Sequence, residues 1–201
     1  MKTQPSHRKS GFTLVELLVV IAIIAVLAGA GFAAGTAAIQ KARRVTALAT
    51  AIAIESAVNQ FYSEYGTMPL DPIAGETTIC KTTDTEGKKV LTALLGYTEA
   101  GNTPLNPRAI KFLSVKDGKN NKGGLITAGT SPNITVSGLY DPWGGPYSIA
   151  LDGDYNETVV AAPLSGSSTT LNGRRVAVWS DGADYNSTTK KAADDVKTWG
   201  Q

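Results

Sequence analysis

The sequence predicts an α+β protein in which a long N-terminal α-helix, membrane-spanning in its first half, packs on a small C-terminal antiparallel β-sheet domain. Three observations predict this fold. Residues 12–39 form an apolar and small-residue run with a single ionisable side chain, Glu16. An apolar stripe at helical spacing extends the run to Tyr65. Short strand-like runs begin near residue 139.

The length and the charge limit the classes of protein. A chain of 201 residues suits one globular domain with one extra element. Of the 19 basic residues, Lys2, Arg8 and Lys9 lie in the first ten positions, and the 16 that remain face 17 acidic residues. The rest of the chain, which we call the body, therefore has nearly balanced charge and no general polyanion-binding surface. Nucleic acid is not an expected partner.

The cysteine and histidine usage narrows the chemistry. Cys80 is the only cysteine, which excludes an intrachain disulfide. If the body is exported, a bound metal is one candidate for holding its loops in place without a disulfide. The only histidine is His7, close to the N-terminus, so the body has no His-based catalytic triad and a zinc site is not expected. We therefore expect a non-enzymatic protein.

Three interpretations compete for the apolar N-terminal segment. A secretory signal peptide would have a shorter apolar core than residues 17–28 with their flanks, although Ala28-Gly-Ala30 has the composition of its cleavage site. A plain membrane anchor explains the length of the run, and the basic residues before it predict a cytoplasmic N-terminus. Neither explains Glu16, because a charge inside a membrane costs several kcal/mol unless it is paired.

The third interpretation accounts for the whole segment. Ser10-Gly11-Phe12-Thr13-Leu14-Val15-Glu16, between a basic leader and a long apolar run, resembles the processing site of type IV prepilins and pseudopilins. The resemblance implies that a prepilin peptidase cuts between Gly11 and Phe12, which removes residues 1–11 as a leader peptide. It also implies N-methylation of Phe12 and an assembly role for Glu16.

The implied role of Glu16 has a physical basis. Cleavage exposes an amine at Phe12, and a carboxylate in a low-dielectric setting strongly favours a cationic partner. In the family, that partner is the N-terminal amine of a neighbouring subunit. Such a pair would fix the register of subunits in a helical filament, since buried ion pairs provide specificity more than stability.

The rest of the helix is expected to pack on its own domain. Its apolar stripe comprises Ala47, Ala51, Ile54, Val58, Phe61 and Tyr65. Gly66 and Pro69 give the stop signal. The expected helix covers residues 12–65, with 12–35 as its transmembrane and assembly part, and its 54 residues would be about 81 Å long.

Residues 66–138 are expected to form a variable loop region, because they are rich in Gly, Thr, Asn and Pro and have little periodicity. Within it, residues 92–95 are expected in a short helix. Four lysines form a loose cluster without interleaved aromatic residues, which favours a solvated loop over a DNA contact: Lys111, Lys116, Lys119 and Lys122.

Residues 139–201 are expected to form the β-sheet and a calcium-binding loop. Strand-like runs cover residues 147–151, 158–161 and 175–179. The Asp-x-Asp-x-Asn spacing of residues 152–156 begins like a calcium loop. However, Glu157 stands at the sixth position and Pro163 at the twelfth, which excludes an EF-hand and leaves a hairpin turn as the expectation.

Two C-terminal segments resemble the major (G-type) pseudopilins of type II secretion. The first is Asp141-Pro-Trp-Gly-Gly-Pro-Tyr147, and the second joins Val178-Trp-Ser-Asp-Gly-Ala-Asp184 to Ala193-Asp-Asp-Val-Lys-Thr-Trp199. The resemblance implies a Ca²⁺ site with ligands at Ser180, Asp184, Asp194 and Asp195. Calcium prefers such oxygen donors from a flexible loop, although a solvated acidic tail remains the alternative.

The resemblance implies a structural subunit of the periplasmic pseudopilus of a type II secretion system, or alternatively of a surface type IV pilus for adhesion, motility or DNA uptake. Before assembly it would be a single-pass protein of the bacterial inner membrane with a periplasmic body. Its partners would be further copies of itself, the prepilin peptidase, the inner-membrane assembly platform and other minor pseudopilins. A membrane-anchored enzyme is disfavoured, because the body has neither a nucleophile elbow nor a phosphate loop.

Overall fold

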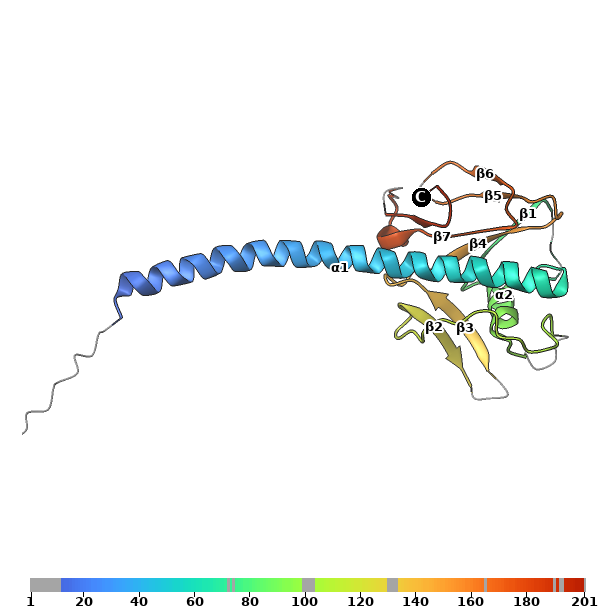
Figure 1. Ribbon diagram of the computed structural model, residues 1–201, viewed down its shortest axis with the longest axis horizontal. Coiled ribbons are helices and arrows are strands. Elements are labelled where there is room, and N and C mark those ends of the chain that lie inside the picture. Colours follow the sequence, from blue (N-terminus) through green and yellow to red (C-terminus); the bar gives the residue numbers. More distant parts are fainter. Residues whose placement is uncertain are drawn as a thin grey trace, which may run out of the picture. The chain divides into compact units, whose positions relative to one another are not determined.

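The computed structural model of the protein describes residues 12–71, 73, 75–98, 104–129, 134–164, 166–189, 191 and 194–200. The chain divides into two compact units, Met1–Lys41 and Ala42–Gln201. The division falls within the first helix, α1 (Leu14–Tyr65). The fold is α+β, with an N-terminal helix followed by a small antiparallel sheet domain, as the sequence predicts (Figure 1).

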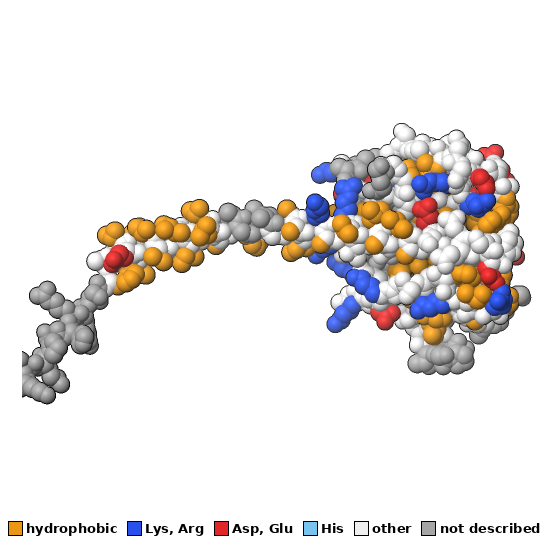
Figure 2. All heavy atoms as spheres, in the orientation of Figure 1, with side chains coloured by type: hydrophobic (Ala, Val, Ile, Leu, Met, Phe, Trp, Pro, Cys, Tyr) orange, Lys and Arg blue, Asp and Glu red, His pale blue; other side chains and the backbone are white. Residues whose placement is uncertain are grey.

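The part of α1 in the first unit is covered with exposed apolar side chains, coloured orange in Figure 2. Leu14, Ile24 and Leu27 are examples. Over the residues that the structure describes, none of the helices is long and apolar enough to cross a membrane.

The part of α1 in the second unit packs as the apolar stripe predicts. Ile54, Val58 and Phe61 are fully buried, and the Phe61 ring lies with its centroid 4.7 Å from that of Tyr65 and 5.4 Å from that of Phe112. The helix ends at the predicted position. Gly66 adopts a left-handed conformation with φ of 70°, and its N–H donates to the Tyr62 carbonyl at 2.8 Å.

A four-stranded antiparallel sheet forms the centre of the second unit. Its strand order is β1-β4-β7-β8: β1 (Thr77–Lys81), β4 (Tyr147–Asp152), β7 (Val176–Ser180) and β8 (Val196–Lys197). Every residue of β4 and β7 is buried, because both faces of the sheet are covered. Ile149 and Val178 join the core that contains α1, whereas Ala150 and Trp179 belong to a second cluster with Val159 and Ala161.

Two further pairs of strands complete the unit: β2 (Gly124–Ala128) with β3 (Thr135–Tyr140), and β5 (Thr158–Ala161) with β6 (Thr169–Asn172). The expected hairpin between residues 147–151 and 158–161 is wrong. β4 pairs with β1 and β7, whereas β5 pairs with β6. β5 leaves the sheet plane because its Val159 and Ala161 cover the second face of the sheet.

The region expected to be loops contains the second helix, α2 (Thr85–Leu95), together with β1, β2 and most of β3. Asp84 caps α2 by accepting the N–H of Gly87 at 2.7 Å, and Gly96 ends it in a left-handed conformation. The helix that the sequence predicts at residues 92–95 is therefore confirmed and is longer than expected. The sequence did not predict these strands because they are short, and because Gly124 in β2 and Gly138 in β3 weaken their periodicity.

Candidate functional site

The N-terminus of α1 is organised around Glu16 and Thr13. The Thr13 N–H and hydroxyl both donate to Glu16 Oε2, at 2.9 Å and 2.7 Å, and the Glu16 N–H donates to Thr13 Oγ1 at 3.3 Å. This reciprocal pattern is a capping box, which satisfies N–H groups that have no partner within the helix. The sequence analysis missed it, although the Thr-x-x-Glu spacing is its signal.

The predicted processing site lies immediately before this cap. Phe12 precedes the helix and has an exposed fraction of 73%, while Gly11 lies outside the described residues. The Glu16 carboxylate is exposed and near the positive end of the helix dipole. A cationic group of another chain could therefore approach it, although it would share the carboxylate with Thr13.

The C-terminal loop brings the segment around Asp184 close to Asp194. A short 3₁₀ helix, η1 (Gly182–Asp184), begins with Gly182 at φ of 71°, and a Cβ atom there would lie only 2.2 Å from the Asp194 carbonyl oxygen. Asp184 Oδ2 accepts the Lys191 N–H at 2.6 Å. Asp194 Oδ1 is buried and accepts no hydrogen bond from the described residues, which is an arrangement that a cation would relieve.

The two other predicted calcium ligands have different neighbours. The Ser180 hydroxyl donates to Asp141 Oδ2 at 2.5 Å, and Asp195 Oδ2 lies 3.8 Å from Lys197 Nζ. Among the described residues, no group of three or more His, Cys, Asp or Glu side chains is placed to hold a metal ion. The donor chemistry of Asp184 and Asp194 fits calcium, whereas the Ser180 side chain is engaged elsewhere.

The Asp141 carboxylate fixes the first C-terminal segment that resembles the pseudopilins. Its Oδ1 accepts three backbone N–H groups, those of Trp143 at 2.9 Å, Gly144 at 2.7 Å and Gly145 at 2.8 Å, and its Oδ2 accepts the Ser180 hydroxyl. Burial raises the pKa of Asp141, while these hydrogen bonds oppose that shift. The segment is thus tied to β7, so the structure gives it a role in positioning the C-terminal loop.

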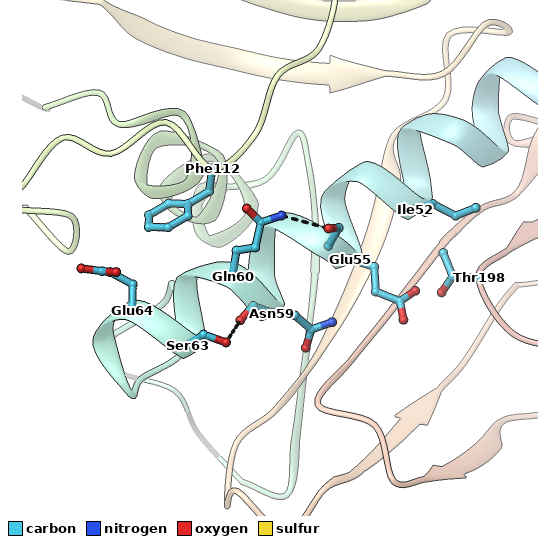
Figure 3. A pocket seen from close by; sticks show the side chains of 9 residues that line it. Ile52, Glu55, Asn59, Gln60, Ser63, Glu64, Phe112 and Thr198 are labelled. Atoms are coloured by element: carbon cyan, nitrogen blue, oxygen red, sulfur yellow. Dashed lines mark hydrogen bonds between the residues drawn. The ribbon is translucent and has the colours of Figure 1, made fainter.

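A groove of about 710 Å³ lies on the second unit along α1 (Figure 3). Its acids are neutralised, because Glu55 pairs with Arg174 at 3.0 Å and Glu64 pairs with Arg108. Two helix-local hydrogen bonds also line it, from Gln60 to Ser56 and from Ser63 to the Asn59 carbonyl, and Figure 3 marks both. It has the character of an exposed polar helix face. It is lined by Ile52, Glu55, Ser56, Asn59, Gln60, Ser63, Glu64, Phe112 and Thr198.

Comparison with known families matches residues 6–32 to the prokaryotic N-terminal methylation motif. The match includes the predicted cleavage pair, the capping box and the exposed apolar start of α1. It supports a place for this chain among the type IV pilin-like proteins. No curated protein and no solved structure matches the chain.

Proposed function

We propose that this protein is a non-enzymatic subunit of the periplasmic pseudopilus of a type II secretion system, held in the inner membrane by its N-terminal helix before assembly. The observation that carries the proposal is the methylation motif at residues 6–32, directly before a helix whose apolar side chains are exposed. The resemblance of residues 141–147 and 178–199 to the major pseudopilins supports the secretion system rather than a pilus.

The exposed start of α1 supports the same proposal on physical grounds. A contiguous apolar surface of this extent is unfavourable in water, so lipid or the helices of neighbouring subunits must cover it. A filament subunit exchanges one covering for the other when it leaves the membrane. The exposed residues of this surface include Val15, Leu17, Leu18, Val19, Ile21, Ile23, Ile24, Val26 and Leu27.

Intact-mass analysis of the protein from its native host tests the processing step. We expect a mature chain that begins at Phe12 and carries one methyl group on its N-terminal amine. Fractionation of the same cells should place the unassembled chain with the inner membrane. An uncut chain, or one that begins after residue 28, would contradict the proposal.

A surface type IV pilus is the second candidate, because the methylation motif is common to both kinds of filament. The two functions predict different phenotypes for a deletion strain. Loss of the pseudopilus should retain the secreted enzymes of the host in its periplasm and leave surface filaments intact. Loss of a pilin should instead remove filaments that shear from the cell surface, and that result would favour the second candidate.

We further propose that the C-terminal loop binds one calcium ion through Asp184, Asp194 and Asp195, with Ser180 contributing its backbone oxygen. The buried Asp194 oxygen, which accepts no hydrogen bond from the described residues, supports this proposal. When bound, calcium would add positive charge beside the carboxylates of Asp184, Asp194 and Asp195. Asp195 would then turn from Lys197 toward the ion.

A further inference from the structure

The loop that follows β4 contains a second buried carboxylate oxygen without a donor. Asp152 is 0% exposed, and its Oδ2 accepts the Glu157 N–H at 2.8 Å. Its Oδ1 is buried and accepts no hydrogen bond from the described residues. A buried carboxylate oxygen that is neither hydrated nor hydrogen-bonded is costly, so this position favours a cation.

The neighbouring side chains add negative charge and oxygen atoms. Asp154 accepts the Asn156 side-chain amide at 2.7 Å and the Asn156 backbone N–H at 3.4 Å. The loop therefore carries oxygen donors at Asp152, Asp154 and Asn156.

Arg175, whose carbonyl oxygen accepts the Asp152 N–H at 2.9 Å, does not supply the cation that Asp152 Oδ1 favours. Arg175 forms an ion pair with Glu157, and its guanidinium lies over the Tyr62 ring with Cζ 4.7 Å from the centroid. Each of these contacts engages the guanidinium with a group other than Asp152. The Asp152 Oδ1 atom therefore accepts no hydrogen bond from it.

The backbone removes the main objection that the sequence raised to a calcium loop. In an EF-hand, donors stand at the first, third and fifth positions and glycine at the sixth, because the sharp turn there requires a positive φ. In this loop Asp152, Asp154 and Asn156 occupy the donor positions. Glu157, at the sixth, adopts φ of 60°, so the turn forms without glycine.

We propose that the loop formed by residues 152–157 binds one calcium ion through the side-chain oxygens of Asp152, Asp154 and Asn156, with water completing the coordination. The site has two carboxylates and no bidentate glutamate at the twelfth position, where Pro163 stands. Low ligand charge of this kind places the dissociation constant at about 10⁻⁴–10⁻³ M. The proposal is independent of the filament function and of the C-terminal loop.

Terbium luminescence on the purified full-length protein tests the site directly, because Tyr155 lies within the loop and can sensitise a bound Tb³⁺. The Asp194→Asn variant serves as the background protein, because this substitution weakens the binding of Tb³⁺ to the C-terminal loop. In this background we expect Asp152→Asn and Asp154→Asn each to lose most of the Tb³⁺ luminescence. In the background protein without these substitutions, calcium should displace Tb³⁺ at a lower concentration than magnesium does. The matched control is Asp117→Asn, at an exposed aspartate outside both loops.

Thermal unfolding distinguishes a calcium ligand from a residue with only a structural role. In chelator, Asp152→Asn should melt at the same temperature as the unmodified chain or higher, because the amide removes a buried charge that has no cation. In millimolar calcium the unmodified chain should become the more stable of the two. An equal deficit of Asp152→Asn in both conditions would overturn the proposal.

Asp154→Asn provides the same comparison of melting in chelator and in calcium at an exposed position. It can therefore still test the proposal if Asp152→Asn fails to fold. Luminescence from both variants equal to that of Asp117→Asn would also overturn the proposal.

Discussion

At the scale of single residues, the Glu16 carboxylate is shared between a local hydrogen bond and the proposed contact with a neighbouring subunit. Thr13 and Glu16 cap the first turn of α1 without any other chain. The capping box needs only an acceptor oxygen at this position, whereas an ionic contact needs the negative charge. Substitutions that keep one property and remove the other can separate the two roles.

We predict that Glu16→Gln retains the helix cap but blocks filament formation, because the amide still accepts from Thr13 while it cannot pair with an N-terminal amine. Glu16→Ala should lose both properties and also block assembly. Both variants should remain in the membrane fraction, and sheared or cross-linked filament yield measures assembly. If Glu16→Gln assembles normally while Glu16→Ala does not, capping is the essential role and the ionic contact is not needed.

A second residue-scale prediction concerns the only thiol. Cys80 is buried in β1, and burial, together with the nearby Asp84 and Glu86, raises its pKa to about 12. The thiolate is the reactive form, so Cys80 should react with Ellman's reagent at pH 8 far more slowly in the folded protein than in denaturant. Equal rates in the two conditions would show that the thiol is accessible.

At the scale of elements, the segment from β7 to β8 depends on contacts that cross the unit. Asp141 holds the turn before β4 and bonds to Ser180 at the end of β7, and Asp194 packs against Gly182. Trp199 then lies edge-to-face on Trp179, with 5.8 Å between the ring centroids. The C-terminal tail is thus anchored on both sides of the loop that the calcium proposal concerns.

We predict that Ser180→Ala destabilises the second unit by about 1.5–3 kcal/mol, because it removes a donor to the fully buried Asp141 carboxylate. Chemical denaturation measures the change in the free energy of unfolding. Ser187→Ala, at an exposed serine in the same segment, is the matched control and should change stability little. Equal effects of the two substitutions would contradict the assigned role of the Asp141–Ser180 bond.

The calcium proposal for the C-terminal loop predicts protection of the tail. Calcium at a hundredfold excess over its dissociation constant would stabilise the bound form by about 2.7 kcal/mol. Trypsin should therefore cut at the exposed Lys191 more slowly in calcium than in chelator. Asp194→Ala should abolish the protection and Asp117→Ala should retain it. Protection that persists in Asp194→Ala would exclude this ligand.

At the scale of the whole molecule, the two units differ in where their apolar side chains point. The core of the second unit comes entirely from residues within that unit, from Ala47 on α1 to Val196 on β8. The described side chains of the first unit from Phe12 to Gln40 are exposed. We therefore expect the second unit to fold without the first, whereas under the proposed function lipid or other copies would cover the first unit.

We predict that a chain starting at Ala42 folds on its own, shows a single cooperative thermal transition and remains monomeric. Its circular dichroism should indicate both helix and sheet, since α2 and the remaining turns of α1 are kept. Analytical ultracentrifugation measures the oligomeric state. Self-association of this truncated chain would show that assembly does not depend on the N-terminal helix.

Local signals in the sequence were sufficient for the long helix, its stop at Gly66, the strands β4, β5 and β7, and the methylation motif. These features depend on residues that are neighbours along the chain, where periodicity, capping and motif spacing operate. By contrast, β1, β2, α2 and most of β3 lie in a region whose composition indicated loops, and only residues 92–95 of α2 were expected in a helix.

Only the tertiary structure decided which strands pair and which polar groups meet. β5 pairs with β6 rather than with β4, the Ser180 hydroxyl donates to Asp141, and Asp152 is fully buried. Each outcome depends on contacts between residues far apart in sequence, or on how completely packing excludes water from one oxygen atom. No local pattern encodes either quantity, because burial and pairing are properties of the folded chain as a whole.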